Sequence, residues 1–445
     1  MQGGHPDGLR IRLGRVDVSM GGGDSGNESE VSVDDVITLG RRLDGWVAAA
    51  RETFGTFLAL PVAWIQLHPN VASLRRHKLK RVEAGIESIL FIQTFRTKWL
   101  DLFMQICSFC AEEEFYLLIL PLLFWNGLYD LARRLTFVVV TGLFVGNIIK
   151  DVFELPRPSS PPVWRPHNQE QLDSTALQDF GFPSTHAMNS VSNSILVAWY
   201  FWDSHSPYHN ALLCLGAGLW ILLLSFSRLY LGAHTGTDVR GGLGLGVLVI
   251  GSYLASCDVL DAIVFQTPVS VLFVSLFVGS IVALLLCPQP RPPTPTFHQN
   301  AFIAGLLWGL LVGSRIAQGD LRLHEIYPLG VTSSVPWQSA TIHFVRNVFG
   351  FVFVIIVRAV VKEVMILIME KGMGIKTKPH VEVVKKRSRA KRGKKVVTKL
   401  FTRDVDIIAM AAVKTITYLC TAMAIDYFYP VLWHTYTRGL SSSVQ

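Results

Sequence analysis

Long runs of apolar residues separated by short polar stretches dominate the chain from about residue 100 onward. Several runs approach the length of about 20 residues that an α-helix needs to cross a bilayer. In hydrocarbon, only helices and closed barrels satisfy every backbone polar group, and uninterrupted apolar runs favour helices. We expect nine spans, at 103–127, 135–150, 186–203, 211–230, 239–257, 263–287, 300–318, 342–370 and 407–430.

Two of these spans contain charges that argue against a simple crossing. The glutamates 112–114 interrupt the first, and the eighth contains Arg358, Lys362 and Glu363 near its middle. Ionisable side chains inside a membrane are costly and usually face a protein interior or a polar cavity. The predicted fold class is therefore all-α, a polytopic membrane protein with about eight to nine transmembrane helices.

Composition supports this fold class. Half of the 445 residues are apolar and only 17% are charged, whereas roughly a quarter are charged in a typical globular domain. Such a chain is not expected to be a soluble enzyme, a fibrous protein or a disordered protein.

The basic charge of the chain is concentrated in one loop. The net charge is +8, and the segment 376–399 contains eleven Lys or Arg and one acid. A basic run beside membrane spans favours contact with anionic lipid headgroups, so we expect no nucleic-acid partner.

These features divide the chain into six regions. We expect a disordered tail at 1–45, an amphipathic membrane-surface region at 46–98, a catalytic membrane core at 99–260, additional spans at 261–370, a basic loop at 371–403, and a last helix with a C-terminal tail at 404–445.

Three polar clusters lie at the ends of predicted spans, at residues 150–158, 183–186 and 227–238. They follow the second span, open the third, and join the fourth to the fifth. Alternate span ends return to the same membrane face. The clusters can therefore converge without placing a charge in the hydrocarbon, whereas one additional span would separate them by about 30 Å.

The side chains in these clusters fit the chemistry of a phosphate ester. Lys150, Arg157 and Arg228 provide three cations for a dianionic phosphate. Ser184 lies at a predicted helix N-terminus, which favours an anion.

Two histidines and an aspartate complete the candidate catalytic set. The spacing of His234 and Asp238 allows the carboxylate to orient one ring nitrogen and leave the other as a nucleophile. His186 is available to protonate a departing alkoxide. Taken singly, each residue could be a snorkelling anchor, a helix cap or an interface residue. Their joint placement on one face favours catalysis.

The pattern Lys-x6-Arg-Pro, Pro-Ser-x-His, Ser-Arg-x5-His-x3-Asp at 150–238 resembles that of the type 2 phosphatidic acid phosphatase superfamily. This superfamily includes lipid phosphate phosphatases, glucose-6-phosphatase and vanadium haloperoxidases. Within it, the chain is similar to the sphingosine-1-phosphate, or long-chain base phosphate, phosphatases. The cues are the segments 156–162 and 181–188 and the additional spans after the third motif.

The resemblance implies a metal-independent lipid phosphatase of the endoplasmic reticulum that acts through a phosphohistidine. His234 would be the nucleophile, His186 the general acid and Asp238 the group that orients His234. The phosphate would be bound by Lys150, Arg157, Ser184 and Arg228. We expect a long-chain base 1-phosphate as substrate, the bilayer as partner, and no metal or other cofactor.

Other functions remain open on the same scaffold. A broad-range lipid phosphate phosphatase would share all three motifs, and a sphingomyelin-synthase-like phosphotransferase would replace water by a lipid alcohol. A transporter or scaffold without activity is a further alternative. The ammonium of a long-chain base could be bound by Asp151 or Glu154, or these acids could be solvated loop charges.

Membrane orientation is predicted from the short loops. Arg133 and Arg134 lie on the face opposite the motifs, so the positive-inside rule places the site in the lumen. Nine spans would put the basic loop 371–403 in the lumen too, against the same rule. The 342–370 segment is therefore suspected not to cross the membrane.

Overall fold

The computed structural model describes residues 69–166, 180–288, 294–319, 336–372 and 405–435. The predicted tail 1–45 and nearly all of the basic loop 371–403 lie outside these residues. All the described residues belong to one compact unit, Thr53–Gln445.

The described residues form helices and no strand. The helices are α2 (Pro69–Gln93), α3 (Lys98–Phe109), α4 (Glu113–Trp125), α5 (Tyr129–Phe153), α7 (Thr185–Tyr200), α8 (Pro207–Tyr230), α9 (Gly236–Gln266), α10 (Val269–Leu286), α11 (Thr296–Gly319), α13 (Pro336–Leu367) and α15 (Val405–Met423), with π-helical turns η1 (Ile368–Gly372) and η2 (Ala424–Phe428).

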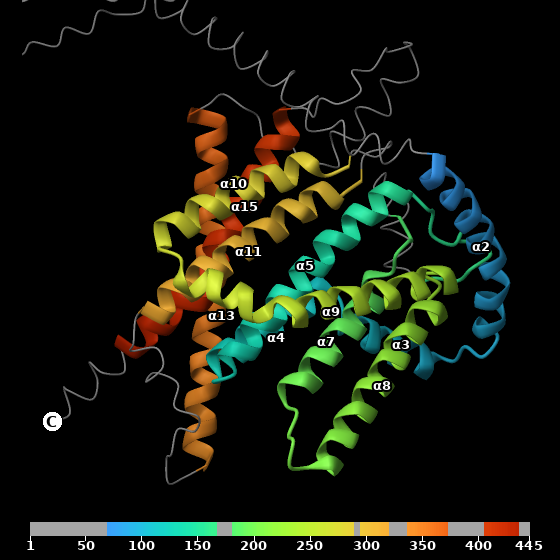
Figure 1. Cartoon of the computed structure of the whole chain (residues 1–445), viewed down its shortest axis with the longest axis horizontal. Coiled ribbons are helices and arrows are strands. Elements are labelled where there is room, and N and C mark those ends of the chain that lie inside the picture. Colours follow the sequence, from blue (N-terminus) through green and yellow to red (C-terminus); the bar gives the residue numbers. More distant parts are fainter. Residues whose placement is uncertain (1–68, 167–179, 289–293, 320–335, 373–404, 436–445) are drawn as a thin grey trace, which may run out of the picture. The chain divides into compact units, whose positions relative to one another are not determined.

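Helix α5 connects two packed groups of helices (Figure 1). On one side it contacts α7 and α9, and α7 also packs against α8. On the other side it contacts α11, which packs against α10 and α15, and α13 packs against α15. The motifs at 150–158, 183–186 and 227–238 all belong to the group formed by α5, α7, α8 and α9.

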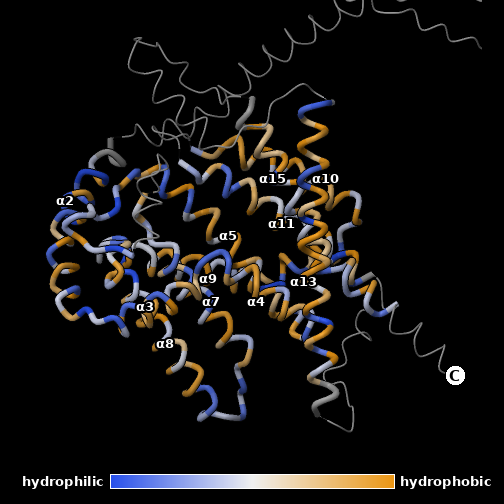
Figure 2. Tube along the Cα trace, turned by 180° about the vertical axis from the view of Figure 1, so that it is seen from behind, coloured by the Kyte–Doolittle hydropathy of each residue, from blue (hydrophilic) through white to orange (hydrophobic). Residues whose placement is uncertain are grey.

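Among the described residues, six helices are long and apolar enough to cross a membrane. They are Tyr129–Phe153, Pro207–Tyr230, Gly236–Gln266, Val269–Leu286, Thr296–Gln318 and Ile408–Thr435. Figure 2 shows mainly hydrophobic residues along α10 and polar residues along α2 and at the turn between α7 and α8. The all-α membrane fold is confirmed, and the total of eight to nine spans stays a prediction.

The first predicted span, 103–127, is wrong as a single helix. Helices α3 and α4 occupy this stretch and are separated at residues 110–112. The break coincides with the glutamates at 112–114, whose charges would be costly within a continuous membrane helix. Glu112 is the N-cap residue of α4.

The close approach of α9 to α7 brings the second and third motifs together. A Cβ at Gly242 would lie 2.2 Å from the Ser184 carbonyl oxygen, and one at Gly246 would lie 2.6 Å from that of Met188. Only glycine therefore permits this spacing of the two helices. Just beyond the contact, the Ser184 N–H donates to the carbonyl oxygen of Asp238 at 3.1 Å.

We expect Gly242→Ala to lower the free energy of unfolding by about 1–3 kcal/mol, because the added methyl group overpacks the α7–α9 interface. Thermal unfolding of the protein in detergent measures the effect. Gly251→Ala on the same helix is the matched control, since its Cβ would meet nothing within 4 Å. Equal melting temperatures for the two variants would contradict this account of the interface.

Candidate functional site: a buried cationic cluster at the helix ends

The second motif opens α7 with a capping serine. Ser184 is completely buried, and its Oγ accepts a hydrogen bond from the Ala187 N–H at 3.4 Å. The first N–H groups of α7 have no partner within the helix, and they give its N-terminus a partial positive charge. This end of α7 is therefore suited to an anion.

Gly181, just before this helix, connects all three motifs through its backbone. Its N–H donates to the Leu155 carbonyl oxygen at 2.8 Å, and its own carbonyl oxygen lies 2.9 Å from His234 Nδ1. A Cβ at this position would lie 3.1 Å from the Pro156 carbonyl oxygen and 3.3 Å from Asp238 Oδ2. The first motif, the second motif and His234 are thus held against one another at one residue.

The contact with Gly181 sets the tautomer of His234. A carbonyl oxygen can only accept, so Nδ1 carries the hydrogen and Nε2 keeps its lone pair. His234 is 1% exposed. Burial, reinforced by the positive charges of Arg157 and Arg228, holds the pKa of His234 well below its usual value. The ring is therefore neutral at physiological pH, as a nitrogen nucleophile must be.

Asp238 lies beside His234 but bonds mainly to the backbone. Its Oδ2 accepts from the Thr235 N–H at 2.7 Å and from Thr235 Oγ1 at 3.0 Å. Thr235 Oγ1 also accepts from the Asp238 N–H at 3.4 Å, which completes a capping box at the start of α9. The distance from Oδ2 to His234 Nδ1 is 3.9 Å. The spacing argument placed both residues on one helical turn, but α9 begins only at Gly236. The Gly181 carbonyl takes the position expected for the carboxylate.

The three predicted cations lie in the same region. Lys150 and Arg228 are 4% and 3% exposed and come from the last turns of α5 and α8. Arg157 Nη1 donates to the carbonyl oxygen of Ala233, the residue before His234, at 3.4 Å. Arg165, which was not predicted, donates from Nε to the Gly232 carbonyl oxygen at 3.1 Å. The first and third motifs are therefore joined by two arginines.

Glu112 is the main site residue that sequence reasoning did not identify. Its Oε1 lies 3.0 Å from His186 Nε2 and 3.8 Å from Arg228 Nη1. Burial alone would raise the pKa of Glu112, but His186 and Arg228 outweigh it and lower the pKa to about 2. Glu112 therefore stays ionised at physiological pH. Its charge only partly offsets burial and the positive charge of Arg228, which together lower the pKa of His186 to about 4.

Helix α2 packs beside the motif loops and also contacts α9. Lys78 Nζ lies 5.0 Å from the ring centre of Phe182. Gln93 Nε2 donates to the carbonyl oxygens of Trp164 and Tyr230 at 2.8 and 3.0 Å. The basic region 46–98 thus contributes a helix that supports the site, in addition to its predicted place at the membrane surface.

The two acids suggested for an ammonium already have partners. Asp151 is 1% exposed and accepts hydrogen bonds from Thr294 and Thr296. Glu154 forms an ion pair with Arg75 at 2.7 Å. Neither carboxylate is therefore available to a ligand in this arrangement.

Within the described ranges, no group of three or more His, Cys, Asp or Glu residues is arranged to hold a metal ion.

Comparison with known proteins places these features in context. Residues 131–258 match the model of the PAP2 superfamily. Over 268 residues the chain is 33% identical to lipid phosphate phosphatase delta of Arabidopsis thaliana. It is 30% identical over 267 residues to a probable sphingosine-1-phosphate phosphatase of Dictyostelium discoideum. Each alignment covers 58% of this chain and 62% of the relative.

Two further alignments cover less of this chain. The chain is 34% identical to human sphingosine-1-phosphate phosphatase 2 over 39% of this chain and 42% of the relative. A transmembrane PAP2-type phosphatidylglycerolphosphate phosphatase from Bacillus subtilis aligns with 47% of this chain and 96% of its own, with 22% identity and a TM-score of 0.31.

The cationic cluster predicts binding of phosphate-like oxyanions. We expect orthovanadate to raise the melting temperature of the detergent-solubilised protein, because a ligand that binds only the folded state stabilises it. Arg157→Gln should weaken this shift by removing one of the three cations.

Arg240→Gln is the matched control, because Arg240 is an exposed arginine on α9. An equal vanadate shift in Arg157→Gln, Arg240→Gln and the unmodified protein would argue against anion binding by the motifs.

Proposed function

The chain contains a PAP2 superfamily domain at residues 131–258, and on that premise we propose that it is a membrane-bound phosphatase of long-chain base 1-phosphates. The reaction would convert sphingosine 1-phosphate or dihydrosphingosine 1-phosphate to the free base and inorganic phosphate. The observation that carries the proposal is the meeting of His234, His186 and the three cations at one end of α5, α7, α8 and α9. The choice of substrate rests on the relatives named as sphingosine-1-phosphate phosphatases.

The first step would be attack on phosphorus by His234. The Nε2 lone pair forms the N–P bond while the bond from phosphorus to the lipid oxygen breaks, and His186 gives its proton to that oxygen. Lys150, Arg157 and Arg228 would neutralise the charge on the equatorial phosphate oxygens, together with the N-terminus of α7 at Ser184. These groups are fixed before substrate arrives, so little reorganisation is needed.

The second step would release phosphate. Water attacks the phosphohistidine, the N–P bond breaks, and His186 accepts a proton from the water as a general base. Asp238 would act on His234 through its contacts with Thr235, the next residue, and would be a positioning residue. Glu112 would hold His186 in place through their 3.0 Å contact, and its charge partly offsets the burial and the Arg228 charge that lower the pKa of His186.

A panel of lipid phosphates assayed for phosphate release tests the proposal. The purified protein should hydrolyse sphingosine 1-phosphate or dihydrosphingosine 1-phosphate with higher kcat/KM than phosphatidate, ceramide 1-phosphate or isoprenoid phosphates. A tenfold preference needs only about 1.4 kcal/mol of differential transition-state binding. Activity should survive excess EDTA, because protein cations provide the charge neutralisation.

Each of the other outcomes points to a different function. Preference for phosphatidate in matched micelles would indicate a broad-range phosphatase. Transfer of a headgroup to a lipid alcohol would indicate a phosphotransferase. Abolition by EDTA with rescue by Mg²⁺ would contradict the metal-independent mechanism.

Replacing each of the two histidines should change the kinetics in a different way. His234→Ala removes the nucleophile and should abolish turnover of every substrate. His186→Ala should impair an alkyl phosphate more than an activated aryl phosphate, because the aryl leaving group needs little protonation. Steady-state kinetics on both substrates gives the comparison, and equal losses of kcat in His186→Ala would count against its role as general acid.

We propose further that the site faces the lumen of the endoplasmic reticulum. Arg133 and Arg134 lie at the other end of α5 from Lys150, about 24 Å away along the helix axis. They pair with Asp130 and Asp261 at 2.6–2.9 Å, but acidic residues contribute little to the positive-inside rule. A cysteine introduced between residues 165 and 178 should resist an impermeant thiol reagent in sealed right-side-out microsomes. Labelling before permeabilisation would place the site in the cytosol.

A further inference from the structure

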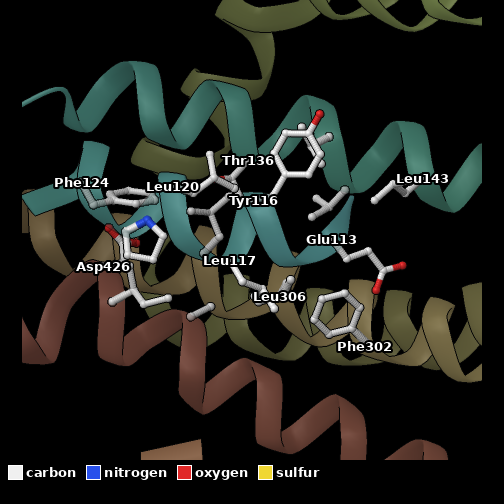
Figure 3. A pocket seen from close by; sticks show the side chains of 16 residues that line it. Glu113, Tyr116, Leu117, Leu120, Phe124, Thr136, Leu143, Phe302, Leu306 and Asp426 are labelled. Carbon is white, nitrogen blue, oxygen red and sulfur yellow. The ribbon is translucent and has the colours of Figure 1, made fainter. Parts of the chain in front are cut away.

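An apolar pocket, open on one side, lies between α4, α5, α11 and the junction of α15 with η2 (Figure 3). Twelve of its sixteen lining residues are apolar. Representative members of the apolar lining are Leu117, Leu120, Val140, Leu143, Phe302 and Leu306. Helices α4, α11 and α15 lie outside residues 131–258, so most of this wall is not part of the PAP2 domain.

One end of the pocket adjoins the catalytic cluster. Figure 3 shows Glu113 at one end of the pocket and Asp426 at the other. Glu113 directly follows Glu112, which contacts His186 at 3.0 Å. Leu143 lies seven residues before Lys150 on α5, which is two helical turns, so both lie on one face. The apolar wall therefore leads along α5 toward the proposed phosphate site.

A second contact ties the pocket to α7. Tyr116 lines the pocket, and its hydroxyl oxygen accepts a hydrogen bond from Asn193 Nδ2 at 2.8 Å. Asn193 belongs to α7, the helix that begins beside Ser184. The position of the pocket relative to the phosphate site is thus fixed from two helices.

The dimensions suit one extended hydrocarbon chain. Helix α4 lines the pocket from Glu113 to Phe124, which spans about 16 Å at the helical rise. An extended chain of roughly a dozen methylenes covers this distance, given a C–C bond of about 1.5 Å and a near-tetrahedral angle. Leu117 lines the pocket and is 38% exposed, so α4 leaves a side through which a chain could enter from the bilayer.

The polar end of the pocket carries charges that complement a long-chain base phosphate. Such a lipid has an ammonium close to its phosphate. Burial and the neighbouring Glu114 raise the pKa of Glu113, whereas the charges of Lys150, one of the proposed phosphate-binding cations, and Lys414 favour its ionised form. Asp151 and Glu154 already have partners, whereas the Glu113 carboxylate takes no hydrogen bond from any described residue.

We propose, resting on the phosphatase function above, that this pocket binds the hydrocarbon chain of a single-chain lipid phosphate and that Glu113 contacts its ammonium. Burial of the chain would provide binding energy that grows with each methylene removed from water. The neighbouring pair of Glu113 and Lys150 would match the ammonium and phosphate of the substrate in charge and order.

The chain-binding part is tested by adding bulk to the pocket. Leu117→Trp should lower the ratio of kcat/KM for an octadecyl monophosphate to that for phenyl phosphate by about tenfold. Leu306→Trp, on the opposite wall, should do the same. Leu118→Trp is the matched control, because Leu118 is 48% exposed on α4 and does not line the pocket.

The ammonium contact is tested with two substrates of equal chain length. Glu113→Gln should lower the ratio of kcat/KM for dihydrosphingosine 1-phosphate to that for octadecyl monophosphate by about tenfold, which is a typical loss for a missing charged contact. Glu114→Gln, an exposed neighbour, should leave this ratio unchanged.

The outcomes separate this inference from the phosphatase proposal. If the unmodified protein releases phosphate from no lipid phosphate, the proposed function fails. The protein could instead hydrolyse these lipids while Leu117→Trp and Leu306→Trp keep the original ratio of kcat/KM for octadecyl monophosphate to that for phenyl phosphate. In that case the pocket does not bind the hydrocarbon chain. If Glu113→Gln leaves the ratio of kcat/KM for dihydrosphingosine 1-phosphate to that for octadecyl monophosphate unchanged, Glu113 does not contact the ammonium.

Discussion

The contact between α7 and α9 is the constraint on which the rest of the site depends. Gly242 lets the two helices approach closely enough for the Ser184 N–H to reach the Asp238 carbonyl oxygen at 3.1 Å. This bond joins the second motif to the third, and Gly181 joins both to the first through Leu155 and His234. Catalytic groups must be positioned to within about 0.5 Å, so the packing of α7 against α9 beside the proposed phosphate site sets the geometry of the reaction.

Burial of charge is the second constraint. Arg228 and His186 lie in a region with little exposure to water, and a buried cation is costly unless an anion is near. Glu112 supplies that anion in the described structure. A bound phosphate would bring further negative charge to the same groups, so Glu112 both compensates the buried cations and influences how tightly they hold an anion. Glu112 belongs to the charged cluster, and the next residue, Glu113, lines the apolar pocket.

The convergence of the three motifs could be predicted from sequence, because alternate span ends return to one membrane face. The role of Glu112 had a visible signal, a charged interruption in an apolar run, but a run of glutamates does not specify a partner. The contact between the Gly181 carbonyl oxygen and His234 could not be predicted, since every residue has a backbone carbonyl and the sequence does not show which one is used. The spacing of His234 and Asp238 suggested a helical pair, yet the helix starts at Gly236, after the histidine.

The central claim is that His234 carries the phosphoryl group during turnover. The most direct measurement is rapid alkaline quenching of the protein with a ³²P-labelled long-chain base phosphate, because phosphohistidine survives alkali and is lost in acid. The account predicts an alkali-stable, acid-labile label on the unmodified protein and none on His234→Ala. Phosphate release without a trapped label, or a label that persists in His234→Ala, would contradict it.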